Sequence, residues 1–242
     1  IGLMRLVPQL MRLYTRLLQV NRELQSSYRN GLLAERSGKL SQKVTIERRA
    51  AVERLLKDRG DKLVVCGLGS STYDVFAAGD HHANFYLWGA MGGAMMIGLG
   101  LAIAEPDRQV VVITGDGEAL MGVGALATIA AQKPNNLSII VLDNEHFGET
   151  GMQKSHTSHG VDLAEIARGC GFLSSQTIYD YDTLNAFNNL PNDPVGPRLA
   201  VVKITSDNPP RALPNVDGIY IKTRFRHCLL YTSPSPRDLY QS

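Results

Sequence analysis

Cysteine is scarce in this sequence, and its spacing excludes two classes of protein. The 242 residues contain only Cys66, Cys170 and Cys228, which lie far apart and form no C-x-x-C pair. They predict neither a disulfide framework nor a zinc site, and they fit a reducing cytoplasm, which is the localisation that we expect. We also expect no secretory signal, because arginines interrupt the N-terminal apolar residues and no small-residue cleavage site follows.

Charge is missing altogether from Ala83 to Ala104, a length that would allow a membrane span. This segment contains Gly89-x-x-x-Gly93, a spacing that also occurs where membrane helices pack together. Its many glycines make a poor lipid-facing helix, however, and favour a tightly packed helix inside an α/β domain. We therefore expect no membrane span, and the composition of 44% apolar and 20% charged residues is typical of a soluble globular protein.

Positive charge is concentrated in the first quarter of the chain. Residues 1–59 hold thirteen Lys and Arg against five Asp and Glu, a net charge of +8, whereas residues 60–242 have a net charge of −6. Leucines at helical spacing between Leu6 and Leu24 predict an amphipathic helix there. Basic helices can bind nucleic acid, but this segment lacks the pattern of aromatic residues between basic ones that would support such binding. We therefore expect no nucleic-acid partner. We treat residues 1–44 as a basic amphipathic helical extension of doubtful origin.

The other end of the chain lacks any periodicity. Residues 228–238 show neither a strand nor a helix pattern, and they look like a sequencing-library adapter read through in one frame. We therefore predict that residues 227–242 are a non-native tail. The functional domain is expected within residues 45–226.

Short apolar strands alternate with helices inside this domain. The predicted strands span residues 62–66, 109–114, 137–142, 176–179 and 199–205. The predicted helices span residues 46–58, 90–104, 120–132, 161–170 and 183–188. Thr45 is the predicted N-cap of the first helix, and residues 67–72 are predicted as a turn. Continuous apolar strands separated by helices predict an α/β fold with a doubly wound parallel sheet and helices on both faces. Ligands of such sheets bind beyond the carboxyl ends of the strands.

Two polar side chains follow consecutive predicted strands. Asp116 comes directly after one strand and Asn144 after the next, 28 residues later, which suits one strand–helix–strand crossover. If the strands are adjacent, both side chains emerge at the same edge, where a carboxylate and an amide oxygen suit Mg²⁺. Gly115 and Gly117 allow a sharp turn close to a ligand, and the following helix offers free N–H groups to a diphosphate.

The Gly115-Asp116-Gly117 turn joined to Asp143-Asn144 resembles the signature of the thiamine diphosphate (ThDP) enzyme family. The resemblance implies the ThDP-binding fold, with ThDP and Mg²⁺ as cofactors. It further implies that Asp116, Asn144 and the main-chain oxygen of His146 hold Mg²⁺ together with two diphosphate oxygens.

Other segments are similar to the same family. In Leu87-Trp-Gly-Ala-Met-Gly92, the carbonyl of Gly89 is expected to accept from the cofactor's 4′-amino group, and Met91 to support its two rings. Gly69 and Ser70 fall where the family's first loop approaches the diphosphate. Glu118 departs from the family, which often has Ser there. Because a carboxylate would repel a diphosphate, we expect Glu118 to turn outward and leave its backbone N–H available.

The order of these motifs over residues 62–172 is most similar to the cofactor-binding part of sulfopyruvate and phosphonopyruvate decarboxylases. Those enzymes remove CO₂ from a 2-oxo acid that bears a second anionic group. The cofactor, and not a protein side chain, provides the reactive group for breaking the carbon–carbon bond. The polar loop of residues 154–159 is expected either to bind the anionic group of such a substrate or to be an ordinary solvated loop. His82 and His156 are the candidate catalytic residues, by proton transfer or substrate contact.

The family also needs a glutamate from a pyrimidine-binding domain, and the remaining sequence is too short for one. The resemblance therefore implies a hetero-oligomer in which a second subunit supplies that glutamate. Alternatives remain open: a carboligase subunit of the acetolactate-synthase type, a 2-oxoacid:ferredoxin oxidoreductase subunit, which the scattered cysteines disfavour, and a non-catalytic ThDP-binding protein. A nucleotide-binding Rossmann protein is disfavoured because Gly98-x-Gly100 and Gly122-x-Gly124 are predicted inside helices.

Overall fold

The computed structural model of the chain describes Gln19, residues 44–190 and residues 196–229. The chain divides into two units, residues 1–43 and 44–242, and the description below concerns the second. The basic extension lies outside the described residues apart from Gln19 and Val44, as does the C-terminal tail from residue 230 onward. Both interpretations of these ends stay predictions.

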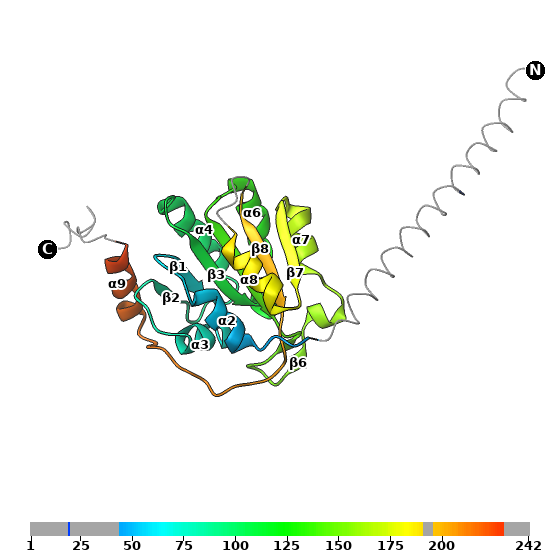
Figure 1. Ribbon diagram of the computed structural model, residues 1–242, viewed down its shortest axis with the longest axis horizontal. Helices are drawn as coiled ribbons and strands as arrows, with labels where there is room; N and C mark the ends of the chain where they lie inside the picture. Colours follow the sequence, from blue (N-terminus) through cyan, green and yellow to red (C-terminus); the bar gives the residue numbers. More distant parts are fainter. Residues whose placement is uncertain (1–18, 20–43, 191–195, 230–242) are drawn as a thin grey trace, which may run out of the picture. The chain divides into compact units, whose positions relative to one another are not determined.

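The second unit is built on one parallel sheet of six strands. Their order across the sheet is β2-β1-β3-β4-β8-β7, and every neighbouring pair is parallel (Figure 1). The strands are β1 (Leu63–Cys66), β2 (Asn84–Tyr86), β3 (Val110–Gly115), β4 (Leu137–Asp143), β7 (Ser174–Ile178) and β8 (Arg198–Lys203). The doubly wound α/β sheet expected from the sequence is confirmed.

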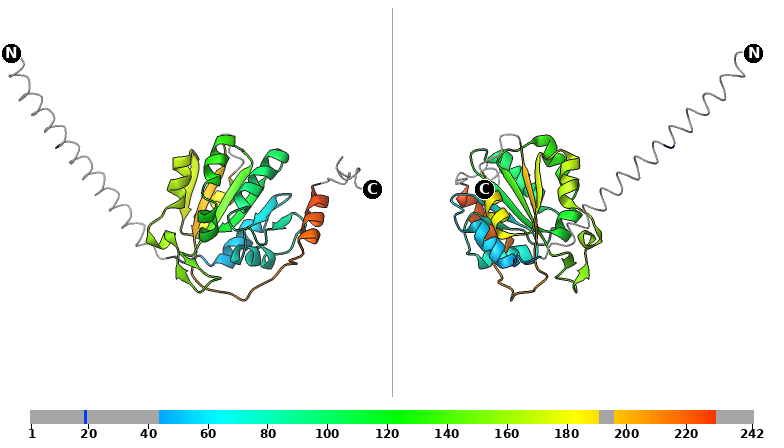
Figure 2. Two further views of the ribbon diagram at one scale, coloured as in Figure 1. Left: turned by 180° about the vertical axis from the view of Figure 1, so that it is seen from behind. Right: turned by 45° about the vertical axis from the view of Figure 1, so that its right-hand side comes forward.

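Both faces of the sheet are covered, so the strands are apolar throughout. Alternate residues serve opposite faces: Val110 and Val112 belong to one apolar cluster, and Val111 and Ile113 to the other. The first face carries α4 (Ala94–Ala104), α6 (Ala125–Gln132) and α7 (Leu163–Cys170), and the second carries α2 (Arg48–Leu56), α3 (Ser70–Ala77) and α8 (Tyr181–Asn189) (Figure 2).

The chain between β1 and β3 contains two elements that the sequence did not reveal. Residues 67–72 were predicted as a turn, but α3 begins at Ser70. The hydroxyls of Ser71 and Thr72 both donate to the carbonyl of Gly67, at 3.0 and 2.7 Å, and so tie the start of α3 to the end of β1. The edge strand β2 has only three residues, too few to show a periodic pattern.

All five predicted helices differ from the observed ones at one end or more; the helices predicted over residues 161–170 and 183–188 begin at Leu163 and Tyr181. The helix predicted from residue 46 begins at Arg48, and Glu47 rather than Thr45 takes the N-cap position, without a side-chain hydrogen bond. The helix predicted over residues 90–104 begins only at Ala94. The helix predicted over residues 120–132 is divided into α5 (Asp116–Met121) and α6.

The division between α5 and α6 lies at a close contact between two stretches of backbone. The backbone of Gly122 packs against that of Gly92, and a Cβ on Gly122 would lie 2.2 Å from the Gly92 carbonyl oxygen. Gly122 and Gly124 therefore lie between two helices and not inside one, contrary to the expectation. Gly98 and Gly100 do lie inside α4.

Two further parts complete the unit. The segment after β4 forms a small antiparallel ribbon of β5 (His146–Phe147) and β6 (Gln153–Lys154), followed by the 3₁₀ helix η1 (His156–His159). The helix α9 (Gly218–Cys228) packs beside β2, where Phe225 contacts Phe85 with ring centroids 5.3 Å apart. None of the helices in the described part of the chain has both the length and the apolar character that crossing a membrane requires.

Candidate cofactor site

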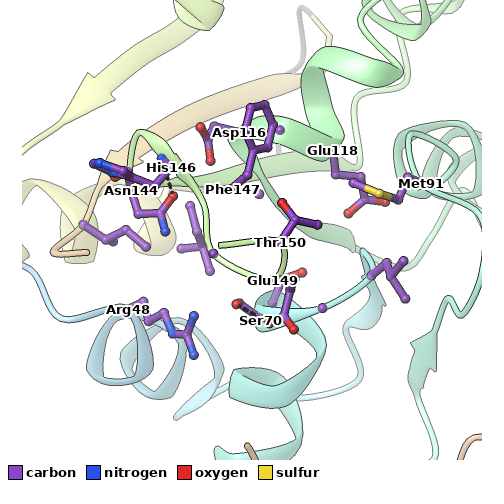
Figure 3. Close-up of a pocket in the computed structure, with 18 residues that line it drawn as sticks. Arg48, Ser70, Met91, Asp116, Glu118, Asn144, His146, Phe147, Glu149 and Thr150 are labelled. Carbon is purple, nitrogen blue, oxygen red and sulfur yellow. Dashed lines mark hydrogen bonds between the residues drawn. The ribbon is translucent and has the colours of Figure 1, made fainter. Parts of the chain in front are cut away.

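A cavity of about 150 Å³ lies beyond the carboxyl ends of β1, β3 and β4 (Figure 3). Its walls come from the segment that joins β1 to α3, from the turn that joins β3 to α5, and from the loop that follows β4. This is the position at which parallel α/β sheets bind their ligands. Strands β3 and β4 are direct neighbours, with Gly115 opposite Leu142. Asp116 and Asn144 therefore follow adjacent strands, as their spacing in the sequence predicted.

All but one of the residues predicted to bind a cofactor line this cavity. They are Gly69, Ser70, Met91, Gly115, Asp116, Gly117, Glu118, Asn144 and His146. The exception is Gly89, which is exposed and has a φ of +77°, a conformation that favours glycine. Gly89 precedes Met91 on the same turn, and its contact with a cofactor stays a prediction.

The carboxylate of Asp116 is buried at the end of β3. Its Oδ2 accepts a short hydrogen bond from Ser155 Oγ and lies 3.2 Å from Thr157 Oγ1. Burial and the nearby Asp143 carboxylate raise the pKa of Asp116 to about 6, although the two hydroxyls oppose the rise. A bound cation would reverse that effect, because it favours the ionised carboxylate.

Asp143, the last residue of β4, is held by a separate set of contacts. Its carboxylate lies 2.8 Å from Thr157 Oγ1 and 2.8 Å from Lys203 Nζ, and it accepts from the backbone N–H of Glu145. The charge of Asp143 is therefore balanced by Lys203 at the end of the neighbouring strand β8. Asp143 does not line the cavity, whereas Asp116 and Asn144, which follow the ends of β3 and β4, do.

The donor set around Asn144 suits a hard cation that keeps few protein ligands. Asn144 Oδ1 accepts from the N–H of His146 at 3.0 Å, which fixes the amide at the cavity wall. The described residues contain no group of three or more His, Cys, Asp and Glu side chains that could hold a metal alone. Mg²⁺ does not need one, because it binds one or two protein side chains and takes its remaining oxygens from phosphates and water.

Two of the glycines that line the cavity have a structural role that a larger residue could not take. A Cβ on Gly117 would lie 2.7 Å from the ring of Phe147, so the turn after β3 and the loop after β4 approach too closely for a side chain. Gly69 has a φ of +84° at the start of α3, where no side chain caps the free N–H groups. These N–H groups are suited to an anion.

Sequence comparison identifies the family. Residues 67–187 match the family described as "Thiamine pyrophosphate enzyme, C-terminal TPP binding domain", TPP being another name for ThDP. The chain belongs to this family. The matched range contains the turn after β3, the loop after β4 and the start of α3, which together form most of the cavity.

Relatives of this TPP-binding domain include complete small subunits and parts of longer enzymes. The chain is 38% identical over 180 residues to "Sulfopyruvate decarboxylase subunit beta" of Methanothermobacter thermautotrophicus, covering 74% of this chain and 94% of the relative. It is 42% identical over 137 residues to the phosphonopyruvate decarboxylase of Streptomyces viridochromogenes, covering 56% of this chain but only 34% of that longer protein. The solved benzoylformate decarboxylase of Polynucleobacter necessarius shares the fold, with a TM-score of 0.58 and 21% identity over 68% of this chain and 34% of that chain.

Glu118 does not turn outward, contrary to the expectation from the family's usual serine. Its side chain is buried, and its Oε2 accepts from Thr114 Oγ1 at 2.8 Å. A Cβ on Gly67 would lie 1.6 Å from Glu118 Oε2, so Gly67 provides the space that the carboxylate occupies. Burial raises the pKa of Glu118, while hydrogen bonds from Thr114 and from the amides of Gly92 and Leu68 oppose the rise.

The two histidines predicted to be catalytic do not line the cavity. His82 is exposed beside His81, before β2, and His156 is exposed at the start of η1, where its ring lies 6.3 Å from that of Phe147. Lys154 and His159 of the same polar loop are exposed as well. Any catalytic contact of these residues would have to form at the outer surface of the TPP-binding domain, and their roles stay predictions.

Several cavity residues were not predicted to bind anything. Phe147, Glu149 and Thr150 belong to the loop after β4. Glu149 accepts from Ser70 Oγ at 3.1 Å and pairs with Arg211 at 2.8 Å. Arg48 reaches the cavity from α2, 68 residues before Asp116 in the sequence, and no local motif marks it.

Proposed function

We propose that this chain is the cofactor-binding subunit of a ThDP- and Mg²⁺-dependent decarboxylase of 2-oxo acids that carry a second anionic group. The observation that carries the proposal is the match to nearly the whole length of a sulfopyruvate decarboxylase β subunit. The cavity supports it, because Asp116, Asn144 and the first loop meet there in one place.

The chain's own residues hold the cofactor in this proposal. Asp116, Asn144 and the main-chain oxygen of His146 bind Mg²⁺, while Ser70 and the free N–H groups at the start of α3 bind the diphosphate. Met91 supports the two rings, and it is suited to this because it is 45% exposed at the cavity mouth. Bound ThDP supplies the nucleophilic carbon and the electron sink for the loss of CO₂.

A second subunit supplies the remaining half of the active site, including the glutamate that activates the cofactor. Met91, Met96 and Met121 are exposed by 45%, 43% and 66%, and they come from segments that meet near the close contact of Gly92 with Gly122. Exposed methionines of this kind are suited to a protein interface because their side chains adapt to a partner. His82 and His156 could then contact substrate from the chain's outer surface.

The experiment is an assay of CO₂ release by the chain alone and by the chain purified with its partner subunit. Sulfopyruvate, phosphonopyruvate and pyruvate are compared, and the organic product is identified to separate decarboxylation from carboligation. We expect turnover only in the complex, only with ThDP and Mg²⁺, and faster with the two dianionic substrates than with pyruvate. Full activity of the purified single chain, or a carboligation product as the main product, would contradict the proposal.

A further inference from the structure

Arg48 is buried in the cavity wall without its full set of hydrogen bonds. Only 3% of the residue is exposed, yet neither Nε nor Nη2 of its guanidinium donates a hydrogen bond to any described residue. Its Nε lies 3.0 Å from Asp74 Oδ2, within ion-pair distance but without hydrogen-bond alignment. Buried donors that remain unpaired are unfavourable, so the site is suited to an acceptor that approaches from the cavity.

Arg48 shares the carboxylate of Asp74 with a second arginine. Asp74 is fully buried and faces both Arg48 and Arg49, with Arg49 Nε 3.2 Å from Asp74 Oδ1. Two arginines therefore share a single carboxylate. Arg48 is also the one Lys or Arg among the described residues that line the cavity, whereas Arg49 is partly exposed and does not line it.

The position of Arg48 along the cavity indicates which part of a ligand it meets. Figure 3 shows Arg48 and Asn144 at one end of the cavity and Met91 at the other. With Met91 beneath the cofactor rings, the opposite end is the end of the diphosphate.

We propose that Arg48 binds the terminal phosphate of the cofactor's diphosphate. The inference rests on the proposed function, because it assumes that the cavity takes ThDP. A guanidinium presents donors in a planar fork that can reach two phosphate oxygens, and Asp74 holds it in place from behind. Arg48 thus adds a charged donor from α2 to the amide donors of α3, and it favours a diphosphate over a monophosphate.

The test compares ligand binding by Arg48→Gln and Arg49→Gln in the complex of the full chain with its partner subunit. Arg49 is the matched control because it pairs with the same Asp74 but lies outside the cavity wall. Calorimetry with Mg²⁺ measures the Kd of thiamine diphosphate and of thiamine monophosphate for each variant. Circular dichroism checks that each variant is folded.

We expect Arg48→Gln to weaken thiamine diphosphate binding roughly ten- to hundredfold, the effect typical of a lost hydrogen bond to a charged group. Thiamine monophosphate should bind to it within about twofold of wild type, and Arg49→Gln should bind both ligands as wild type does. If Arg48→Gln does not fold, Arg48→Lys is used, with a smaller loss expected because lysine keeps the charge but not the fork.

Three results would overturn the inference. They are wild-type affinity for thiamine diphosphate in the Arg48 variant, equal losses for the two ligands, and equal losses in the Arg48 and Arg49 variants. The last two would mean that Arg48 acts only through the structure around Asp74. A wild-type complex that binds no ThDP in the presence of Mg²⁺ contradicts the proposed function instead, so the two failures are distinguishable.

Discussion

Thr157 Oγ1 lies 3.2 Å from Asp116 Oδ2 and 2.8 Å from Asp143 Oδ1, so a single hydroxyl contacts the carboxylates at the ends of two adjacent strands. Ser155 Oγ contacts Asp116 as well and lies 2.9 Å from Thr157 Oγ1. The segment after β6 therefore fixes the orientation of the Asp116 carboxylate, and through Thr157 it connects this carboxylate to the ion pair of Asp143 with Lys203.

Removing these hydroxyls should weaken Mg²⁺ binding without removing a proposed ligand. Groups that orient a metal ligand typically contribute ten- to hundredfold to metal affinity. We expect roughly that loss for Ser155→Ala and for Thr157→Val, measured by calorimetric titration of Mg²⁺ at saturating ThDP. Ser158→Ala is the control, because the Ser158 hydroxyl donates to the carbonyl of Ser155 and contacts neither carboxylate. Unchanged Mg²⁺ affinity in both variants would show that Asp116 is oriented without them.

The raised pKa of Asp116 predicts how the metal-free protein responds to pH. The pKa of Asp116 is about 6 in the folded state, whereas the ordinary pKa of an aspartate is about 3.8, so the folded protein binds more protons between these two pH values than the unfolded chain does. The contribution of Asp116 to stability therefore falls as pH rises from about 4 to 6. We expect Asp116→Asn to flatten this part of the stability profile in urea unfolding and to raise the stability at pH 7. A profile identical to that of wild type would contradict the assigned pKa.

Mg²⁺ affinity should depend on the same ionisation. The cation competes with the proton on Asp116, so its affinity should fall as pH decreases below about 6. Calorimetry between pH 5 and 8 in buffers of different ionisation enthalpy would reveal the released proton. Affinity that is independent of pH across this range would argue against Asp116 as a ligand.

Glu118 places a buried carboxylate in the wall of the proposed ThDP site, and its charge should oppose the binding of the anionic cofactor. Glu118→Gln keeps the size of the side chain and its acceptor for Thr114 while removing that charge. We expect roughly two- to tenfold tighter ThDP binding at pH 8 and a thermal midpoint that is unchanged or higher, since like charges in a poorly solvated site repel strongly. Glu53→Gln, at an exposed position on α2, is the control. Weaker ThDP binding by Glu118→Gln would mean that the charge itself serves the site.

Gly117 should tolerate no side chain. Gly117→Ala would place a Cβ 2.7 Å from the ring of Phe147, and overpacking of this kind typically costs about 1–3 kcal/mol. Gly100→Ala is the contrasting variant, because it lies inside α4 with open space around the new Cβ and should stabilise the chain by about 0.5–1 kcal/mol. Urea unfolding measures both changes. Equal stability of the two variants would contradict the close approach of Phe147.

The long apolar strands and the site at their ends could be predicted from sequence, because β3 and β4 are buried on both faces and remain apolar throughout. One strand–helix–strand crossover is enough to make these strands adjacent. The positions of Asp116 and Asn144 at one edge of the sheet could therefore be predicted from their spacing alone. The strand β2 could not be predicted, since three residues carry too little periodicity. The helix α3 was missed because its first residues, Ser70 to Thr72, were interpreted as part of a turn.

The errors at the site have a different origin. Glu118 was placed outward by considering its charge against a diphosphate, but the space beside Gly67 depends on how β1 and α5 pack, which no local pattern shows. Arg48 belongs to a helix far from the motifs in sequence, and only the packing of α2 on α3 brings it to the cavity. Such long-range placements follow from the tertiary structure and not from residue spacing.

The most direct test of the account is calorimetry of ThDP binding to wild type and Asp116→Ala, with and without Mg²⁺. Asp182→Ala, at an exposed position on α8, serves as the folded control. The account predicts that wild type and the control bind ThDP only when Mg²⁺ is present, and that Asp116→Ala loses this metal-dependent binding. Tight, Mg²⁺-dependent binding that survives in Asp116→Ala would contradict it.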